Sequence, residues 1–427
     1  MNQNLENIIE LAQTQGASQS EVYQVASVSH PVVFEANRLK QLENSQAEGT
    51  ALRLWYEGRP GVAVAYGQFD PETLVKRAIS LSQFNSLDSA HLTPARTQIV
   101  DEQESSTATE TFIELGKAAI AKIRTRYPEA ICEAEFDCET ERTTLINSQG
   151  LHCEYTETSL SYYLGVELVK GEDFLGVYDG ETSRKSLNCD RAVIDILQRL
   201  DWAQTNTPSP TGKVPVLLTA NAATLLWDTV ASALSGKRVR EKSSPWSELL
   251  GEAVANPQVT ILQQPHIAPY DCPFDDEGTP TQQLSLIEQG KVNSFYCDRS
   301  LAAELGIAPT GNGFRSDLGS YPTASLVNLI ISPGKLGFSE LIHRLDNGII
   351  VDQLLGGGAD ISGDFSVNVE LGYKVTNGKV VGRIKDTAIS GNVYQILKEA
   401  VTFGNDSLWN GSCHTPSMIV EGCSVTR

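Results

Sequence analysis

The chain has 427 residues, a length that suggests two or three domains at roughly 150 residues per domain. Its content of 41% hydrophobic and 20% charged residues excludes an intrinsically disordered chain. The 53 acidic residues outnumber the 33 basic ones and give a net charge of −20, which disfavours broad contact with phosphate backbones and anionic lipid. We therefore expect no direct nucleic-acid partner and no membrane partner.

Signals for export and membrane insertion are missing from the sequence. No window reaches the roughly 18 consecutive apolar residues that a membrane span needs. Residues 1–21 have no basic segment followed by an apolar core, so they do not predict a secretory signal. The 8 cysteines include no CxxC pair and are typical of free thiols in a reducing compartment. Together these features predict a cytoplasmic protein.

Helices and strands alternate in the first part of the chain. The first predicted element is an amphipathic helix that ends at Gly16 and has one apolar face, formed by Leu5, Ile8, Ile9 and Ala12. Strands are predicted at 20–28 and 31–43, followed by a hairpin over 50–67 with its turn at 57–61. Asp70 and Pro71 are typical of a helix N-cap and first turn, and the predicted inner face of this helix is Leu74, Val75, Ala78 and Leu81.

The next segment is predicted to contain one more helix and then mainly strands. A polar stretch over 86–110 leads to a helix over 110–126, which Tyr127 and Pro128 end. Several short strands are expected from 130 to 180. One hairpin among them is predicted across the run Asn147-Ser148-Gln149-Gly150.

A polar segment with two prolines at 203–213 marks the clearest domain junction. It predicts an N-terminal αβ domain over 1–202, a linker over 203–213 and a C-terminal domain over 214–427. The second domain opens with a buried-type strand at 214–218 and a helix over about 221–235. Its remainder is rich in glycine, proline and β-formers until a helix at 394–401. The predicted fold class is α+β, with a β-rich, largely antiparallel C-terminal domain.

The histidines do not form a recognisable metal motif. The closest of the 6 lie 61 residues apart, so no helix carries two of them one turn apart, as an HExxH-type site requires. Cys413 and His414 are the only adjacent cysteine–histidine pair. We interpret this pair as a loop thiol beside a surface imidazole, although a site assembled from distant residues stays open.

Motifs for a catalytic nucleophile are also missing. The sequence has no GxSxG elbow and no P-loop, which disfavours an α/β-hydrolase and a P-loop NTPase. Each cysteine is better interpreted as a buried inert thiol than as a nucleophile. The acidic run Asp275-Asp276-Glu277 is predicted to lie on a solvated turn before Gly278.

One glycine-rich run, at 354–366, stands out. Its three consecutive glycines, 356 to 358, and the later Gly363 permit positive φ and close backbone approach. Such a run can present several N–H groups to a carboxylate or a peptide backbone. The alternative is a tight connection between strands of a sheet. A second turn, at 390–392, is predicted to precede the helix at 394–401.

These segments resemble the TldD/PmbA family, also called the modulator of DNA gyrase family. The resemblance rests on the run GGGADISGDFS at 356–366, an NG turn at 377–378, AISGN at 388–392 and a helix that ends in GND at 404–406. The hairpin at 50–67, the NSQG turn and the runs SGKRVREKSS and PFDDEGTPT, at 235–244 and 273–281, also resemble family features. The similarity extends from about residue 20 to about residue 425.

The resemblance implies a metallopeptidase family whose cytoplasmic proteolytic complex has two related subunits. One subunit carries zinc on a His-Glu-x-x-x-His helix completed by a later cysteine, and the PmbA or TldE type lacks this site. By spacing from Pro215, the motif positions here fall on Asp228, Thr229 and Ala233, with Cys413 as the later cysteine and Cys423 as a weaker choice. These residues cannot hold catalytic zinc, which needs about three protein ligands. The chain is therefore expected to be inactive alone and to carry neither cofactor nor catalytic residue.

The leading hypothesis is a non-zinc subunit that pairs with a zinc-bearing TldD-type homologue. It would help to enclose a cleft for peptide or unfolded substrates, with zinc on the partner. The expected cleft residues belong to the glycine-rich run and the second turn: Gly356, Gly357, Gly358, Gly363, Asp364, Ser366, Gly391 and Asn392. One alternative is a non-enzymatic homodimer that binds a protein partner as a scaffold or modulator. A third reading is an independent hydrolase that uses a cysteine.

Overall fold

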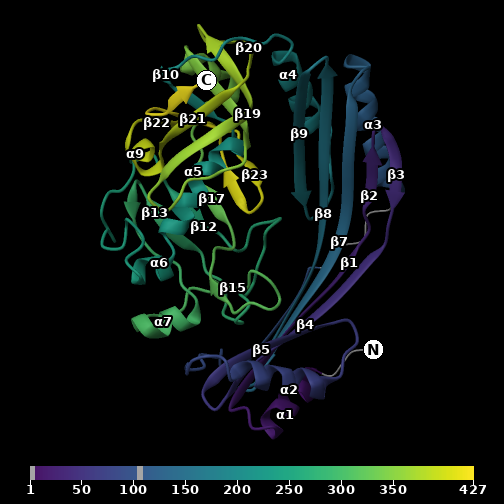
Figure 1. The fold of residues 1–427 in the computed structure, drawn as a ribbon, viewed down its shortest axis with the longest axis vertical. Helices are drawn as coiled ribbons and strands as arrows, with labels where there is room; N and C mark the ends of the chain where they lie inside the picture. The colour runs from purple at the N-terminus through teal and green to yellow at the C-terminus, as the bar shows by residue number, and fades with distance from the viewer. Residues whose placement is uncertain (1–4, 103–108) are drawn as a thin grey trace.

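The computed structural model describes residues 5–102 and 109–427, so residues 103–108 of the predicted polar stretch lie outside the described residues. Its fold is α+β with mostly antiparallel sheets, which confirms the predicted class. Long strands of the N-terminal half stand beside a more rounded C-terminal half (Figure 1). None of the helices in the described parts of the chain combines the length and apolar composition needed to cross a membrane.

The N-terminal half is built on one largely antiparallel sheet. Its elements are α1 (Leu5–Thr14), β1 (Gln19–Ser29), β2 (Val32–Glu35), β3 (Arg38–Leu42), β4 (Ser45–Tyr56), β5 (Arg59–Tyr66), α2 (Pro71–Ser82), β6 (Arg96–Glu102), α3 (Thr109–Arg126), β7 (Ile131–Asn147), β8 (Leu151–Lys170), β9 (Asp173–Ser183) and α4 (Asp190–Trp202). The strand order is β3-β2-β7-β1-β4-β5, and β8 pairs with β6, β7 and β9. Helices α1 and α2 lie at one end of the sheet, and α3 and α4 lie at the other (Figure 1).

Local signals place several of these elements where they were predicted. The Asp70 carboxylate accepts a hydrogen bond from the Thr73 N–H at 3.0 Å and caps α2, which begins at Pro71. The predicted inner face of α2 is correct for three residues, but Leu81 is 41% exposed and Ser82 is buried in its place. The hairpin β4–β5 turns at Glu57 and Gly58, both with positive φ, so the turn is shorter than predicted.

The strands between 130 and 180 are long, where short ones were expected. β7 and β8 pair from Ile131↔Glu167 to Ile146↔His152, and β9 pairs along β8. The predicted hairpin turn is confirmed: the Asn147 Oδ1 accepts hydrogen bonds from the N–H groups of Gln149 and Leu151. The alternation of apolar and polar residues located strand segments in this part of the chain. It did not show that neighbouring segments form one long strand.

The C-terminal half contains two larger sheets around α5 and a two-stranded sheet formed by β15 and β16. Its elements are β10 (Gly212–Lys213), β11 (Val216–Leu218), α5 (Ala220–Ala233), α6 (Gly236–Arg240), β12 (Ile261–Gln263), β13 (Leu284–Glu288), β14 (Lys291–Val292), α7 (Arg299–Leu305), β15 (Gly313–Phe314), β16 (Thr323–Ala324), β17 (Leu329–Ile331), α8 (Phe338–Leu345), β18 (Gly348–Leu355), β19 (Asp364–Thr376), β20 (Lys379–Ile384), β21 (Thr387–Asn392), α9 (Val393–Lys398), β22 (Val401–Phe403), β23 (Leu408–Asn410), β24 (Cys413–Thr415), β25 (Met418–Val420) and β26 (Ser424–Thr426). One sheet has the order β10-β26-β21-β19-β18-β11-β25-β22, and the other has the order β14-β13-β12-β17-β24-β23.

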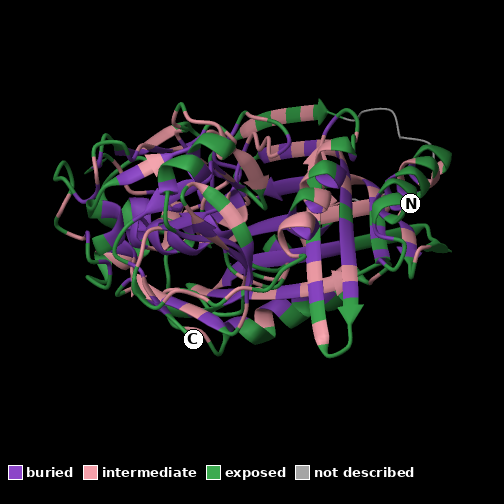
Figure 2. Ribbon diagram, turned by 90° about the horizontal axis from the view of Figure 1, so that it is seen from above, coloured by how far each residue is buried: buried purple, intermediate pink, exposed green. Residues whose placement is uncertain are grey.

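Helix α5 anchors this half because nearly all of its buried residues are apolar. The Trp227 side chain is fully buried, and its Nε1–H donates to the Thr415 Oγ1 at 2.7 Å. Figure 2 shows the buried residues concentrated inside this half and along the long N-terminal strands. The last predicted helix is shorter than expected, because α9 ends at Lys398 and residues 401–403 form β22.

The predicted linker runs along the C-terminal sheet. The Thr207 N–H donates to the Arg383 carbonyl at 2.8 Å, and the Arg383 N–H donates to the Thr205 carbonyl at 2.8 Å. A hydrophobic core that both halves share joins α3, α4, β7 and β8 to β18 and β19, and it includes the fully buried Tyr373. The boundaries at 202 and 214 stay a prediction, and the shared core holds the two halves together around them.

The acidic run at 275–277 is not a solvated turn, so that prediction is wrong. Asp275 and Glu277 are 1% and 5% exposed, and they lie where the C-terminal half meets the N-terminal sheet. The Asp275 carboxylate accepts hydrogen bonds from the N–H groups of Glu277, Thr279 and Gly313. These acids can be buried because backbone N–H groups and tertiary contacts of the junction satisfy them. The local sequence pattern does not show those contacts.

Candidate functional site

A groove runs between the edge of the N-terminal sheet and the C-terminal half. It consists of three adjoining cavities of about 390, 370 and 340 Å³, which we call the first, second and third cavity. Asn221, in the first turn of α5, lines all three. Asp179 and Arg191 line the first and second, and Tyr178 and Asn410 line the second and third. The shared walls make the cavities one continuous surface feature.

Helix α5 forms one side of the groove, and the helical repeat determines which of its polar side chains point there. The helix begins at its N-cap Thr219, whose Oγ1 accepts from the Ala222 N–H. Asn221, Thr224 and Asp228 recur at helical spacing and line the third cavity. The opposite face carries most of the buried core residues, and the buried Ala222 and Leu225 also border the third cavity.

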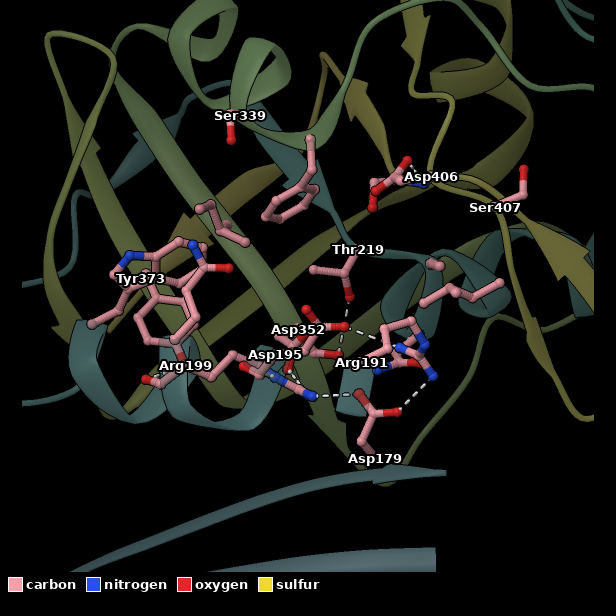
Figure 3. A pocket seen from close by; sticks show the side chains of 18 residues that line it. Asp179, Arg191, Asp195, Arg199, Thr219, Ser339, Asp352, Tyr373, Asp406 and Ser407 are labelled. Atoms are coloured by element: carbon pink, nitrogen blue, oxygen red, sulfur yellow. Dashed lines mark hydrogen bonds and ion pairs between the residues drawn. The ribbon is translucent and has the colours of Figure 1, made fainter. Parts of the chain in front are cut away.

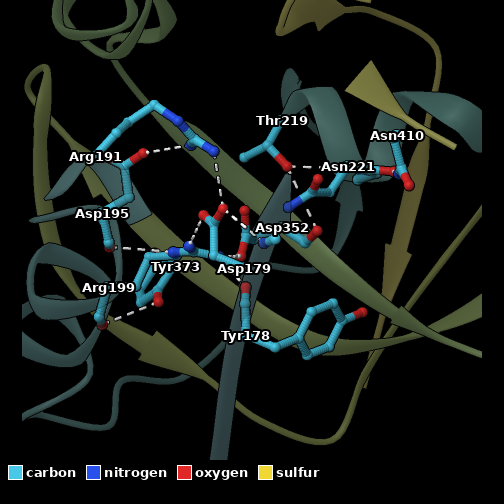
Figure 4. A network of polar contacts seen from close by, with 12 residues as sticks. Tyr178, Asp179, Arg191, Asp195, Arg199, Thr219, Asn221, Asp352, Tyr373 and Asn410 are labelled. Carbon is cyan, nitrogen blue, oxygen red and sulfur yellow. Dashed lines mark hydrogen bonds and ion pairs between the residues drawn. The ribbon is translucent and has the colours of Figure 1, made fainter. Parts of the chain in front are cut away.

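A network of ion pairs crosses the floor of the groove (Figure 4). The Arg199 guanidinium contacts the carboxylates of Asp179 at 2.6 Å and Asp352 at 3.2 Å, and it donates to the Tyr178 carbonyl at 2.9 Å. The Arg191 guanidinium contacts Asp179 at 3.1 Å and Asp195 at 3.0 Å. These contacts tie β9, α4 and β18 together, and buried charges of this kind are tolerated because each has partners.

The groove is electrostatically negative. Its described lining residues include six carboxylates and two guanidinium groups, from Asp179, Glu181, Asp195, Asp228, Asp352, Asp406, Arg191 and Arg199. Partial burial raises the pKa of Asp195, against the effect of the nearby Arg191. Burial also raises the pKa of Asp228 and lowers that of His414. A groove with this charge favours cationic ligands over anionic ones.

Aromatic side chains line the second cavity. The Trp409 ring centroid lies 4.8 Å from that of Tyr270 and 4.8 Å from that of His414. His414 thus belongs to the wall of the groove, and its neighbour Cys413 is buried in β24. The pair was interpreted as a loop thiol beside a surface imidazole, which is wrong in both respects, because the thiol lies in a strand and the imidazole is half-buried.

Three of the predicted cleft glycines lie in the groove. Gly356, Gly357 and Gly358 line the third cavity together with Asp228 of α5. Gly356 and Gly357 have φ of +59° and +78°, a conformation that L side chains rarely adopt. A Cβ atom at Gly356 or Gly358 would meet no heavy atom within 4 Å, so the loop borders open space.

The other predicted cleft residues do not line the groove. The Asn392 Nδ2 donates to the Ser362 carbonyl at 2.9 Å and to the Asp364 carboxylate at 2.8 Å, and its Oδ1 caps α9. A Cβ atom at Gly363 would lie 2.6 Å from the Tyr394 ring, so close packing favours glycine at this position. Ser366 and Gly391 are ladder positions of β19 and β21. These residues build the turn that supports the glycine-rich run.

Of the four predicted motif positions, Asp228 and Cys413 lie close enough for the Asp228 carboxylate to raise the pKa of the Cys413 thiol, and the other two point elsewhere. Asp228 lines the third cavity, but Thr229 and Ala233 are 3% and 0% exposed and lie on the core face of α5. Cys413 is 8% exposed, and burial raises the pKa of its thiol to about 12. No group of three His, Cys, Asp or Glu side chains that could hold a metal occurs in residues 5–102 and 109–427.

The ion-pair network was missed because its members come from distant parts of the chain. Asp179, Arg199 and Asp352 belong to β9, α4 and β18, which are adjacent only in the folded protein. A local signal was present in α4, where Arg191, Asp195 and Arg199 recur every four residues. This spacing places three charged side chains on one helix face.

The thiols are expected to resist alkylation in the folded protein. Burial raises the pKa of Cys132 and Cys153 to about 11 and that of Cys189 and Cys423 to about 12, so few thiolates form at neutral pH. Iodoacetamide at pH 7.5 followed by intact mass should label the native chain at least about tenfold more slowly than the urea-unfolded chain. Rapid labelling of one thiol in the native chain would contradict this expectation. It would favour the hypothesis of an independent hydrolase that uses a cysteine.

Comparisons with known proteins agree with the resemblance. Residues 211–427 match the PmbA/TldA metallopeptidase C-terminal domain, and residues 20–82 match PmbA/TldA metallopeptidase domain 1. A metalloprotease of Methanothermobacter thermautotrophicus is 26% identical over 280 residues, which cover 62% of this chain and 60% of that relative. An uncharacterized protein of Methanocaldococcus jannaschii is 25% identical, with 98% of this chain and 99% of that relative covered. The solved structure of TldE from Thermococcus kodakarensis has the same fold, with a TM-score of 0.87, 23% identity and coverage of 99% of this chain and 100% of that chain.

Proposed function

The chain belongs to the TldD/PmbA family of metallopeptidases, and we propose that it is the subunit without zinc in a two-component peptidase. A homologous subunit with the zinc motif would supply the hydrolytic chemistry. This chain would help to enclose and hold an extended or unfolded peptide. The observation that carries the proposal is that, of the motif positions on α5, only Asp228 lines the groove, while Thr229 and Ala233 are buried.

The residues of α5 do not fit a catalytic zinc ion. Such a site needs about three protein ligands and one open position. Of the motif positions, only Asp228 carries a ligand atom on the groove, and Thr229 and Ala233 face the core. We therefore derive no catalytic step in this chain, and its part in the reaction is to bind and orient the substrate.

The walls of the groove support binding of an extended peptide. Within the described residues, β9 pairs only with β8 and β23 pairs only with β24, so both are edge strands of their sheets. Residues 180–182 of β9 and 408–410 of β23 line the second cavity. Backbone groups at sheet edges recognise peptide backbones irrespective of side chains. The glycine-rich loop at 356–358 would extend this backbone contact into the third cavity.

The first test is the zinc content and activity of the chain with and without its proposed partner. The chain purified without chelators or metal-affinity resin is expected to hold near-zero zinc and to leave casein-derived peptides intact. Co-expression with a zinc-motif homologue from the same genome should give a complex that co-purifies and hydrolyses them. About one zinc per isolated chain, or hydrolysis by it, would contradict the proposal. If the chain forms a homodimer and does not bind the homologue, the result would favour the scaffold alternative.

The cleft role of the glycine-rich loop is tested by Gly357→Val. The new side chain would require a strained φ of +78° and would contact Val367, so it should narrow the third cavity and misplace the peptide. We expect peptide hydrolysis by the two-subunit complex to fall about tenfold. Gly171→Val is the matched control, because Gly171 has φ of +64° and open surroundings in the β8–β9 turn. Equal activity of both variants would leave the loop as a structural turn only.

A further inference from the structure

The first cavity combines aromatic side chains with carboxylates that outnumber its cations (Figure 3). The Trp202 ring centroid lies 6.3 Å from that of Phe338, with the rings nearly parallel, and 5.3 Å from that of Tyr373. The charged residues that line the cavity are four carboxylates and two guanidinium groups: Asp179, Asp195, Asp352, Asp406, Arg191 and Arg199. The cavity therefore offers both an apolar surface and uncompensated negative charge.

The two arginines are already engaged by other groups of the protein. The Arg199 guanidinium is 8% exposed, and its three nitrogens donate to Asp179, Asp352 and two backbone carbonyls, those of Tyr178 and Asp195. Arg191 uses both terminal nitrogens on Asp179 and Asp195. Both guanidinium charges are paired with carboxylates, although the 36% exposed Arg191 retains N–H groups that no acceptor of the described residues uses, and this pairing argues against a carboxylate or phosphate site.

Asp406 provides an acceptor without an ion-pair partner among the described residues on the other side of this network. The Asp406 Oδ1 accepts the Ser417 N–H at 3.1 Å, and no Lys or Arg of the described residues forms an ion pair with this carboxylate. The Ser407 Oγ is buried and lacks a hydrogen-bond partner within the described structure. Figure 3 shows Asp406 set apart from the cluster formed by Asp179, Arg191 and Asp352. Because the Ser407 Oγ is inaccessible, Asp406 is the acceptor that this side offers to the cavity, and a bound cation would pair with its carboxylate.

From these features we infer that the first cavity is a subsite for a cationic side chain, arginine above all, of a peptide bound in the groove. The inference rests on the proposed function and adds the substrate class. Asp406 would face the guanidinium and accept its hydrogens. Trp202 and Phe338 would cover the planar group or its aliphatic stem. Lysine would bind less well, because its ammonium cannot stack as a plane.

The charge of the whole groove favours the same class of substrate. The second and third cavities add Glu181 and Asp228 without adding a cationic residue. Low-dielectric walls focus such a field, so cationic peptides should be attracted from solution and this attraction should weaken with salt. A neutral apolar side chain would fill the aromatic part of the first cavity but leave the Asp406 carboxylate without a cation.

The test is peptide binding by the full chain without its partner, measured by fluorescence anisotropy at pH 7. Three fluorescein-labelled hexapeptides differ at one central position, which is arginine, its neutral isostere citrulline, or norleucine. The arginine peptide is expected to bind about tenfold more tightly than the other two. Asp406→Asn should remove most of this preference and leave the citrulline affinity unchanged. This variant retains the acceptor for the Ser417 N–H, so the loop should stay folded.

Asp228→Asn is the matched control, since it removes the same charge from the groove but lies in the third cavity. It should preserve most of the preference for arginine. An equal loss in both variants would mean a general field effect and would overturn the subsite. Equal binding of the three peptides would overturn the subsite and leave the cleft proposal standing. A failure of every peptide to bind at high micromolar protein would count against the proposed function itself and against the inference with it.

Discussion

Replacing Arg315 by alanine is expected to lower the free energy of unfolding by about 3–5 kcal/mol. The Arg315 guanidinium is 3% exposed and contacts the Glu21 carboxylate at 2.9 Å, so it joins the C-terminal half to β1 of the N-terminal sheet. It also donates to the Ser320 carbonyl at 2.7 Å and stacks 5.0 Å from the Tyr23 ring centroid. Its removal would leave the fully buried Glu21 with Arg53 as its remaining ion-pair partner at the junction.

The comparison that isolates burial is Arg240→Ala. Arg240 pairs with Glu304 on the surface, where the two side chains are 42% and 48% exposed. Exposed pairs contribute about 0–1 kcal/mol, so this variant should be nearly as stable as the parent chain. Urea titrations followed by tryptophan fluorescence and circular dichroism measure both effects. A loss below about 1 kcal/mol for Arg315→Ala would show that this network does not hold the two halves together.

Elements with local signals could be predicted from the sequence. The Asp70–Pro71 pair determines the start of α2 through backbone chemistry within one turn, and Asn147 organises the β7–β8 turn with its own side chain. Both signals act over fewer than five residues, which is why they survive without tertiary information. The α+β class followed from the order of such elements.

The junction and the groove could not be predicted in this way. The run at 275–277 has the composition of a solvated turn, and only contacts with residues far away in sequence explain its burial. Likewise, the resemblance pointed to Gly356–Gly358, whereas the groove network needs Asp179 and Asp352 from different sheets. Motif spacing also placed Thr229 on the site, although helical periodicity turns it into the core.

The stability of the chain is expected to depend on the protonation of Glu277, and Glu277→Gln should change that dependence. Burial raises the pKa of Glu277 to about 7, with Asp298 and Glu21 adding to the effect and Arg53 opposing it. The ordinary value, 4.5, applies to the unfolded chain. Between these values the folded state binds the proton more tightly, so the free energy of unfolding should fall as pH rises from about 4.5 to about 7.

A glutamine at this position has no proton to lose, so the stability of the variant relative to the parent chain should rise with pH. Its amide oxygen can still accept the Arg299 N–H, which the Glu277 Oε2 accepts at 2.8 Å. The difference in unfolding free energy between variant and parent should shift by about 3 kcal/mol in favour of glutamine between pH 4.5 and pH 8. Urea titrations at four pH values measure this difference, in which titrating groups distant from Glu277 cancel. Asp275 does not cancel, because the Glu277 carboxylate raises its pKa and the glutamine removes that effect. Glu304→Gln, at a 48% exposed side chain, should differ from the parent by no more than about 0.5 kcal/mol at each pH. A pH-independent difference for Glu277→Gln would mean that Arg53 keeps the Glu277 carboxylate ionised in the folded protein. The junction would then be held by a full ion pair at every pH tested.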